Sequence, residues 1–198
     1  MHRRELLKWS IALIGASASA SVSRALLAGA QPVAGAAGAV FTQPQWATVN
    51  LLSDMIIPPT DTPGAVAAGV PDFIATMVSD WYHPTERDIF FRGLADLDVF
   101  CIEQDGVPFH QAPEATRVAA LQAQEQAAAD YQSPLPTKMS YQQPTDENSP
   151  FFNKVKELVV LGYYTSEVGA TQELAYLPMP GRYDGDYDFA KVGRPWSY

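Results

Sequence analysis

Prolines divide this chain into segments of helical length, and this division constrains the fold more than any other feature. Proline lacks a backbone N–H and restricts the residue before it, so a helix ends near a proline or begins just after one. Pro58 and Pro59 close one apolar segment, whereas Pro71, Pro113 and Pro150 each open another. The alternating β-branched runs typical of half-buried strands do not occur in the sequence. The chain is therefore predicted to be all-α.

About five helices are predicted, in a small irregular bundle with long loops. Apolar residues recur at helical spacing between the prolines. Thr42 can cap the first helix, and Thr85-Glu86-Arg87-Asp88 resembles a capping box that opens the third. The predicted helices span residues 43–57, 72–81, 85–104, 113–131 and 150 to at least 161.

The segments outside the helices differ in composition. Residues 58–65 hold three prolines and a glycine, which predicts a rigid turn. Residues 31–41 are predicted to be a flexible leader because they are rich in alanine and glycine. Residues 178–198 are predicted to be an extended, irregular C-terminal tail. The predicted organisation is thus a signal at 1–30, the leader, and one helical domain at 42–198 that includes the tail.

The N-terminus has the order of a twin-arginine export signal. Two arginines, an apolar pair and a lysine precede a weakly hydrophobic run, and these residues are Arg3, Arg4, Leu6, Leu7 and Lys8. Small-x-small cleavage sites occur at 18–20 and at 28–30, of which we favour the second. This pathway exports proteins that are already folded, often around a cofactor. The alternative is an ordinary apolar N-terminal helix.

The charge of the chain argues against nucleic acid as a partner. The net charge is −9. Residues 1–30 hold four basic residues and one acidic residue, so the net charge of the remainder falls to −12. A chain this acidic repels phosphate backbones, and it has no evident attraction for anionic lipid.

The sequence contains no recognisable cofactor or catalytic motif. His83 and His110 lie next to prolines or turn residues and lack metal-ligand spacing. Dinucleotide-binding glycine motifs and the serine-hydrolase elbow do not occur. The run Asp184-x-Asp186-x-Asp188 lacks the glycine and glutamate of a calcium loop, so an acidic tail is the preferred interpretation. We expect no catalytic, cofactor or metal site in this chain.

Cys101 is the only cysteine, so the chain cannot form an internal disulfide. In an exported protein it is either a buried helix thiol or the partner of a cysteine in another chain. An intersubunit disulfide is the more specific of these two hypotheses, since it also requires a cysteine in the partner chain.

Two blocks of sequence resemble the gluconate 2-dehydrogenase subunit 3 family. The first runs from Pro58-Pro59-Thr60-Asp61-Thr62-Pro63-Gly64-Ala65 through Gly69-Val70-Pro71-Asp72-Phe73-Ile74 to Arg92-Gly93-Leu94-Ala95-Asp96-Leu97-Asp98. The second holds Phe152-x-x-Val155-Lys156-Glu157-Leu158, Gly162-Tyr163-Tyr164-Thr165-Ser166-Glu167-Val168-Gly169 and Tyr176-Leu177-Pro178-Met179-Pro180-Gly181.

The resemblance implies a non-catalytic small subunit of a periplasmic sugar or polyol dehydrogenase at the inner membrane. It implies a large partner subunit that holds FAD, a cytochrome c subunit with haem c, and co-export of the folded flavoprotein by the twin-arginine translocase. The family supplies no catalytic residues to transfer to this sequence.

Aromatic residues beside glycines and prolines are candidate anchors for such a partner, because they bury much area at low entropic cost. The candidate interface residues are Tyr163, Tyr164, Tyr176, Tyr183, Tyr187 and Trp196. The alternative for Tyr163 and Tyr164 is packing within the core. Two other functions stay open: an independent periplasmic enzyme or ligand-binding domain, and a structural scaffold at the membrane.

Overall fold

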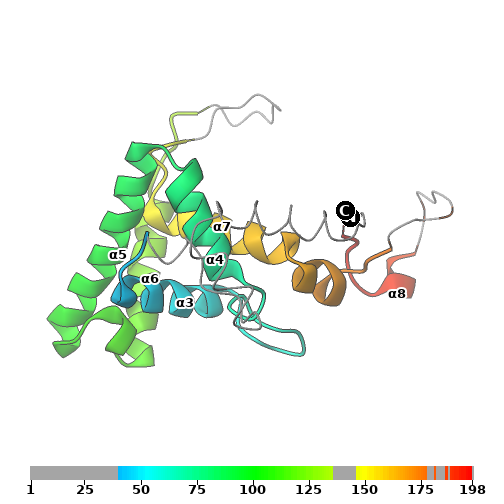
Figure 1. The fold of residues 1–198 in the computed structure, drawn as a ribbon, viewed down its shortest axis with the longest axis horizontal. Helices are drawn as coiled ribbons and strands as arrows, with labels where there is room; N and C mark the ends of the chain where they lie inside the picture. The colour runs from blue at the N-terminus through cyan, green and yellow to red at the C-terminus, as the bar shows by residue number, and fades with distance from the viewer. Residues whose placement is uncertain (1–39, 136–145, 178–180, 182–185, 187, 198) are drawn as a thin grey trace, which may run out of the picture. The chain divides into compact units, whose positions relative to one another are not determined.

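The structure is a computed structural model that describes residues 40–135, 146–177, 181, 186 and 188–197. The described residues form helices and no strand, which confirms the all-α prediction (Figure 1). The elements are α3 (Gln43–Ile56), α4 (Val70–Thr76), the π-helix η2 (Met77–Trp81), α5 (Pro84–Asp105), the 3-10 helix η3 (Phe109–Gln111), α6 (Glu114–Ala129), α7 (Phe151–Thr165), the π-helix η4 (Gly169–Glu173) and α8 (Phe189–Val192). The five predicted helices correspond to α3, α4 with η2, α5, α6 and α7.

Thr42 caps α3 as predicted, and the cap also includes the side chain of Gln45. The Thr42 hydroxyl accepts from the Gln45 N–H at 3.4 Å, and the Gln45 side chain accepts from the Thr42 N–H at 2.9 Å. Phe41 and Trp46 lie on either side of this cap with ring centroids 6.3 Å apart, in the positions of a hydrophobic staple. Phe41 is buried, so the predicted leader is wrong at its last residue, which belongs to the core.

The predicted cap of the third helix at Thr85 is wrong. Helix α5 begins at Pro84, and its N-cap is His83. The third residue of the helix is Glu86, whose carboxylate accepts from the His83 N–H at 3.2 Å. Pro84 fits the first helical position because its φ is already helical and its missing N–H would have no partner there.

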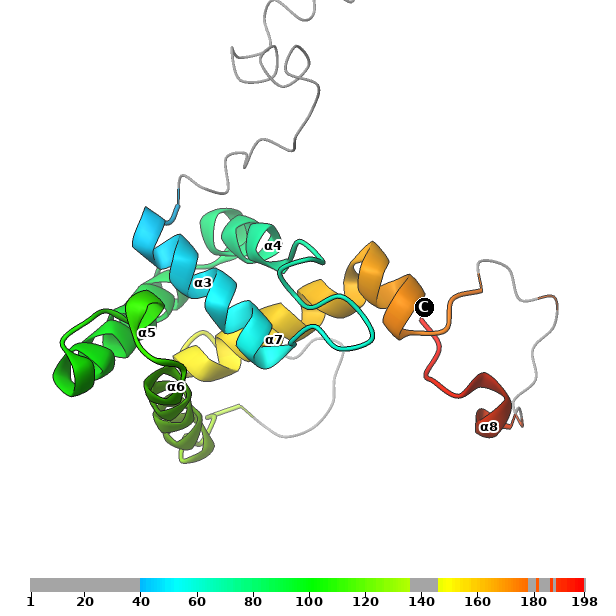
Figure 2. The same cartoon turned by 90° about the horizontal axis from the view of Figure 1, so that it is seen from below.

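Helix α7 is central to the described domain, since it contacts α3, α4, α5 and α6 (Figure 2). Glycines permit two of these close approaches. A Cβ on Gly93 of α5 would lie 2.0 Å from the Phe151 ring, and a Cβ on Gly162 of α7 would lie 2.7 Å from the Phe73 ring. Phe90 and Phe151 complete the α5–α7 contact with their rings edge to face at 5.5 Å.

The turn at 58–65 is fixed to the end of α7. Tyr163 donates its hydroxyl to the Pro63 carbonyl at 2.9 Å, and Thr62 donates to the Glu173 carboxylate at 2.8 Å. The Asp54 carboxylate accepts from the Val66 N–H at 2.9 Å. These bonds give the predicted turn a physical basis, because polar groups in it and just after it have partners on α7, η4 and α3.

The tail is more ordered than the prediction of an irregular segment. Its described part contains α8, where Asp188 accepts from the Ala190 N–H at 3.0 Å and Gly193 ends the helix with φ 76°. Ala175 and Trp196 form an isolated parallel bridge, in which the Ala175 N–H donates to the Pro195 carbonyl at 2.8 Å. The last described residues are therefore bonded to the segment that follows η4.

Candidate interaction surface

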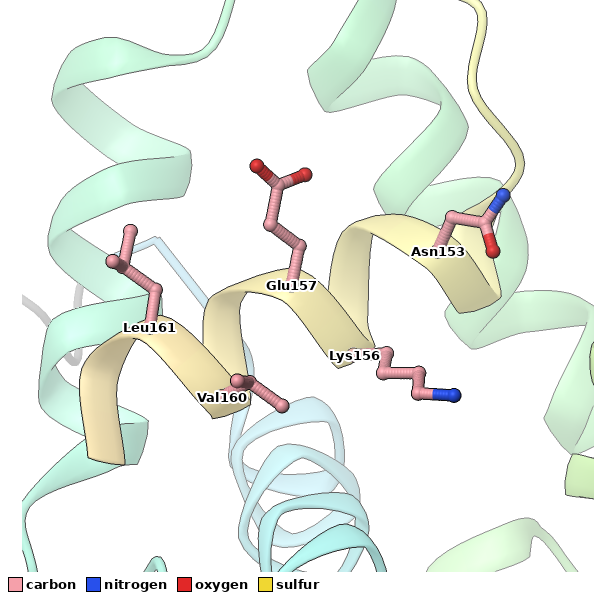
Figure 3. A pocket seen from close by; sticks show the side chains of 5 residues that line it. All are labelled: Asn153, Lys156, Glu157, Val160 and Leu161. Atoms are coloured by element: carbon pink, nitrogen blue, oxygen red, sulfur yellow. The ribbon is translucent and has the colours of Figure 1, made fainter. Parts of the chain in front are cut away.

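One face of α7 is turned outward and becomes apolar toward its C-terminal end. Buried and exposed residues alternate with helical periodicity, so Val155, Val159 and Tyr163 face the core. We call the opposite side the α7 outer face, and its residues are Asn153, Lys156, Glu157, Val160, Leu161 and Tyr164. Figure 3 shows that Asn153, Glu157 and Leu161 follow one line along the helix, whereas Lys156 and Val160 follow a second.

A cleft of about 680 Å³ lies between the α7 outer face and the end of η2. Trp81 and Leu161 both line it, together with the acidic residues Glu147 and Glu157. Trp81 is 72% exposed and Leu161 is 46% exposed. Large apolar side chains that are exposed around a hollow are typical of binding surfaces.

A buried ion pair forms part of this cleft. Lys154 Nζ lies 3.1 Å from the Glu86 carboxylate, and the two side chains are only 3% and 8% exposed. Lys154 also donates to the Asp146 carbonyl at 3.4 Å and lies 5.5 Å from the centroid of the Tyr82 ring. The pair joins the first turn of α5 to the first turn of α7, so it fixes the relative positions of two walls of the cleft.

Burial raises the pKa of the Tyr82 phenol far above its ordinary value, and the charges of Glu86 and Glu157 raise it further. The phenol is therefore protonated at neutral pH. The neutral phenol is a polar group beside the ion pair. Its raised pKa makes it unsuited to act as a general base at neutral pH.

The residues before α7 are held by Asp146. The hydroxyl of Ser133 donates to its carboxylate at 2.5 Å, that of Tyr131 at 3.1 Å, and the Asn148 N–H at 3.1 Å. These bonds lower the pKa of Asp146, with Ser133 as the largest cause. The carboxylate thereby ties the chain after α6 to the chain before α7.

The structure separates the predicted interface residues. Tyr164, Tyr176 and Trp196 are 41%, 53% and 46% exposed, as an interface requires. Tyr163 is only 2% exposed and bonded to Pro63, so its assignment to an interface is corrected to the alternative of core packing. Tyr183 and Tyr187 lie outside the described residues, as do the export-signal residues Arg3, Arg4, Leu6, Leu7 and Lys8.

Sequence reasoning missed Trp81 and Leu161 as surface residues. Both lie in apolar helical segments, where core packing is the default interpretation. For Trp81 a signal was available, because it ends its helix three residues before Pro84 and an end position has fewer neighbours to cover it. No comparable signal marks Leu161, whose exposure depends on where the other helices contact α7.

Cys101 lies on the buried side of α5 and is 0% exposed. Burial raises the pKa of its thiol, and the charges of Asp98 and Asp105 add to this effect. The geometry favours the buried-thiol alternative over the intersubunit disulfide, since the sulfur is covered by its own domain. A disulfide with another chain stays a hypothesis that would require α5 to expose this side.

Within the described residues, no three His, Cys, Asp or Glu side chains lie close enough together to hold a metal ion. Of the acidic run in the tail, Asp184 lies outside the described residues. Among the helices that are described, none has the length and apolar character needed to cross a bilayer.

A family model described as gluconate 2-dehydrogenase subunit 3 matches residues 43–181. The chain belongs to the gluconate 2-dehydrogenase subunit 3 family. The matched segment begins with α3 and ends between η4 and α8, so it includes both sides of the cleft. No curated protein and no solved structure matches the chain.

Proposed function

We propose that this chain is the non-catalytic small subunit of a periplasmic dehydrogenase complex that oxidises gluconate, another sugar acid, a sugar or a polyol. In this proposal it binds and stabilises the FAD-containing catalytic subunit. It also carries that subunit, already folded, through the twin-arginine translocase. A cytochrome subunit with haem c completes the complex at the inner membrane.

Family membership over residues 43–181 is the observation that carries the proposal, because the family is named for a subunit of a dehydrogenase. The order of Arg3, Arg4 and Lys8 before a weakly apolar run supports the export role. The twin-arginine pathway exports folded proteins, yet the sequence of this chain has no cofactor motif. The signal is explained if the partner subunit holds the cofactor and is exported with this chain.

Replacement of both arginines tests the export role. The variant Arg3→Lys/Arg4→Lys keeps the charge but removes the guanidinium pair, and we expect dehydrogenase activity and flavin to remain in the cytoplasmic fraction. Arg24→Lys is the matched control, because it alters an arginine of the same segment outside the motif. Cell fractionation with a flavin assay measures the outcome.

Normal periplasmic activity after deletion of the whole chain would refute both the export role and the stabilising role. Oxidation of an alcohol by the purified single chain would favour the alternative of an independent enzyme.

A further inference from the structure

Trp81 projects from a segment of backbone that is held by side-chain hydrogen bonds. It ends η2, a π-helix, and π-helical turns occur frequently at functional sites. The Arg87 side chain, one turn into α5, donates from Nε to the Val78 carbonyl at 3.0 Å and from Nη2 to the Ser79 carbonyl. These bonds hold the end of the π-helix, although the indole of Trp81 is 72% exposed. An aromatic side chain on rigid backbone loses little entropy on binding.

The opposite side of the cleft is equally well anchored. Leu161 and Tyr164 are exposed, yet their neighbours Gly162 and Tyr163 are buried against Phe73 and the turn at Pro63. Because these buried contacts oppose rotation of α7 about its axis, Leu161 and Tyr164 stay exposed to solvent. A hollow with an exposed apolar side chain on well-held backbone at either side suits one large apolar side chain of a partner.

The charges around the cleft define the second property of this partner. Glu86 and Lys154 neutralise each other, so they contribute little net charge. Glu147 and Glu157 are exposed, and in the described part of the chain neither has a hydrogen bond or an ion pair. Lys156 lies on the other line of the α7 outer face, away from Glu157 (Figure 3). The net charge at this edge of the cleft is therefore negative, and a partner that complements it carries a basic group.

We propose that the cleft between Trp81 and Leu161 is the docking surface for the catalytic flavoprotein subunit. Its occupant is a segment of that subunit with a large apolar side chain beside a lysine or arginine. The apolar side chain enters between Trp81 and Leu161, and the basic group lies against Glu157 and Glu147. This inference rests on the proposed function, and both sides of the cleft lie within the segment that the family model covers.

The apolar contact is tested with the full chain, tagged at its C-terminus and co-expressed with its flavoprotein subunit. Capture is measured as flavin absorbance per small subunit, and affinity is measured by titration of the separated subunits. We expect Trp81→Ala and Leu161→Asp each to weaken binding by about tenfold or more, as is typical for loss of an interface hot spot. Val99→Ala and Ile102→Asp are matched controls, since these α5 residues are 53% and 51% exposed.

The basic partner group is tested by charge reversal. Glu157→Lys is expected to slow association and to weaken the salt dependence of binding, because complementary charges act mainly on the association rate and are screened by salt. Glu103→Lys is the control, because it makes the same charge change at an exposed position of α5.

The outcomes separate the two proposals. If the wild-type chain captures no flavoprotein, the proposed function fails and the docking surface fails with it. If capture is normal but the cleft variants behave like the α5 controls, only the docking surface is refuted. Self-association of the chain that is lost in Trp81→Ala would assign the surface to a second copy and also overturn the proposal. Circular dichroism and thermal unfolding of each variant exclude misfolding as the cause of lost binding.

Discussion

At the residue scale, the Glu86–Lys154 pair is a buried charged contact between two helices. Removing two charges from water is costly, and this pair compensates through a 3.1 Å contact and further bonds to the His83 N–H and the Asp146 carbonyl. The pair connects residues 68 positions apart in the chain. It therefore joins the first turn of α5 to the first turn of α7.

We predict that Lys154→Met lowers the free energy of unfolding by about 3–5 kcal/mol, because it leaves the Glu86 carboxylate buried without its partner. Lys156→Met is the matched control on the same helix, since Lys156 is exposed, and its effect should stay within about 0.5 kcal/mol. The double variant Glu86→Leu/Lys154→Met should regain most of the loss. Urea unfolding measures all three, and a double variant no more stable than Lys154→Met would contradict the explanation.

At the scale of elements, glycine determines how closely helices approach. α5 passes α7 at Gly93, where the Phe151 ring fills the space that a Cβ would need. The two π-helices have a related effect at the ends of α4 and α7, since each changes the direction of the side chains that follow. Trp81 and the segment after Glu173 owe their positions to these irregular turns.

Gly93→Ala is predicted to destabilise the protein even though alanine favours a helix. The gain in helix propensity is about 1 kcal/mol, whereas overpacking costs about 1–3 kcal/mol. The new Cβ would lie 2.0 Å from the Phe151 ring, which is only 4% exposed and has little room to move, so the cost lies at the upper end of that range. Gly181→Ala is the control, because nothing lies within 4 Å of its Cβ position. An unchanged or higher unfolding midpoint for Gly93→Ala in urea would show that the two helices can separate at little cost.

At the scale of the whole molecule, one core joins the long helices of the part of the chain that the structure describes. It extends from Phe41, before α3, to Tyr163, near the end of α7. Cys101 belongs to this core, so the accessibility of its thiol reports on the folded state of the domain.

We predict that a thiol reagent labels Cys101 only as fast as the domain unfolds. Two effects protect the thiol: it is 0% exposed, and its raised pKa lowers the thiolate fraction at any pH below that pKa. The labelling rate should therefore increase with urea in parallel with unfolding. Rapid labelling of the native chain, or a covalently linked complex in non-reducing electrophoresis, would instead support the intersubunit disulfide.

Much of the fold could be predicted from sequence because its signals are local. Prolines mark the ends of helices through their own geometry, and the cap at Thr42 depends on residues within four positions of it. The cap at His83 is local as well, since it depends on Pro84 and Glu86, and it was missed because Thr85 matched the preferred cap residue type. The order of the tail was missed for a different reason, since the bond between Ala175 and Pro195 joins residues far apart in the sequence.

The exposure of the predicted interface residues was only partly predictable. Tyr164, Tyr176 and Trp196 are exposed, and their role in an interface stays a prediction, whereas the same reasoning placed the buried Tyr163 with them. Adjacent residues on a helix point about 100° apart, so Tyr163 and Tyr164 differ in environment although their sequence context is almost identical. Which of the two faces the core depends on the position of α4 and of the turn at Pro63.

The sequence alone determined the all-α class, the approximate limits of the helices and the resemblance to a family, because these depend on proline geometry, helical periodicity and local motifs. Only the tertiary structure decided that Lys154 is buried with Glu86, that Tyr163 lies in the core, and that Trp81 and Leu161 border one cleft. These features depend on contacts between residues far apart in the chain. Their partners are brought together by the packing of α7 against the other helices, which no local pattern specifies.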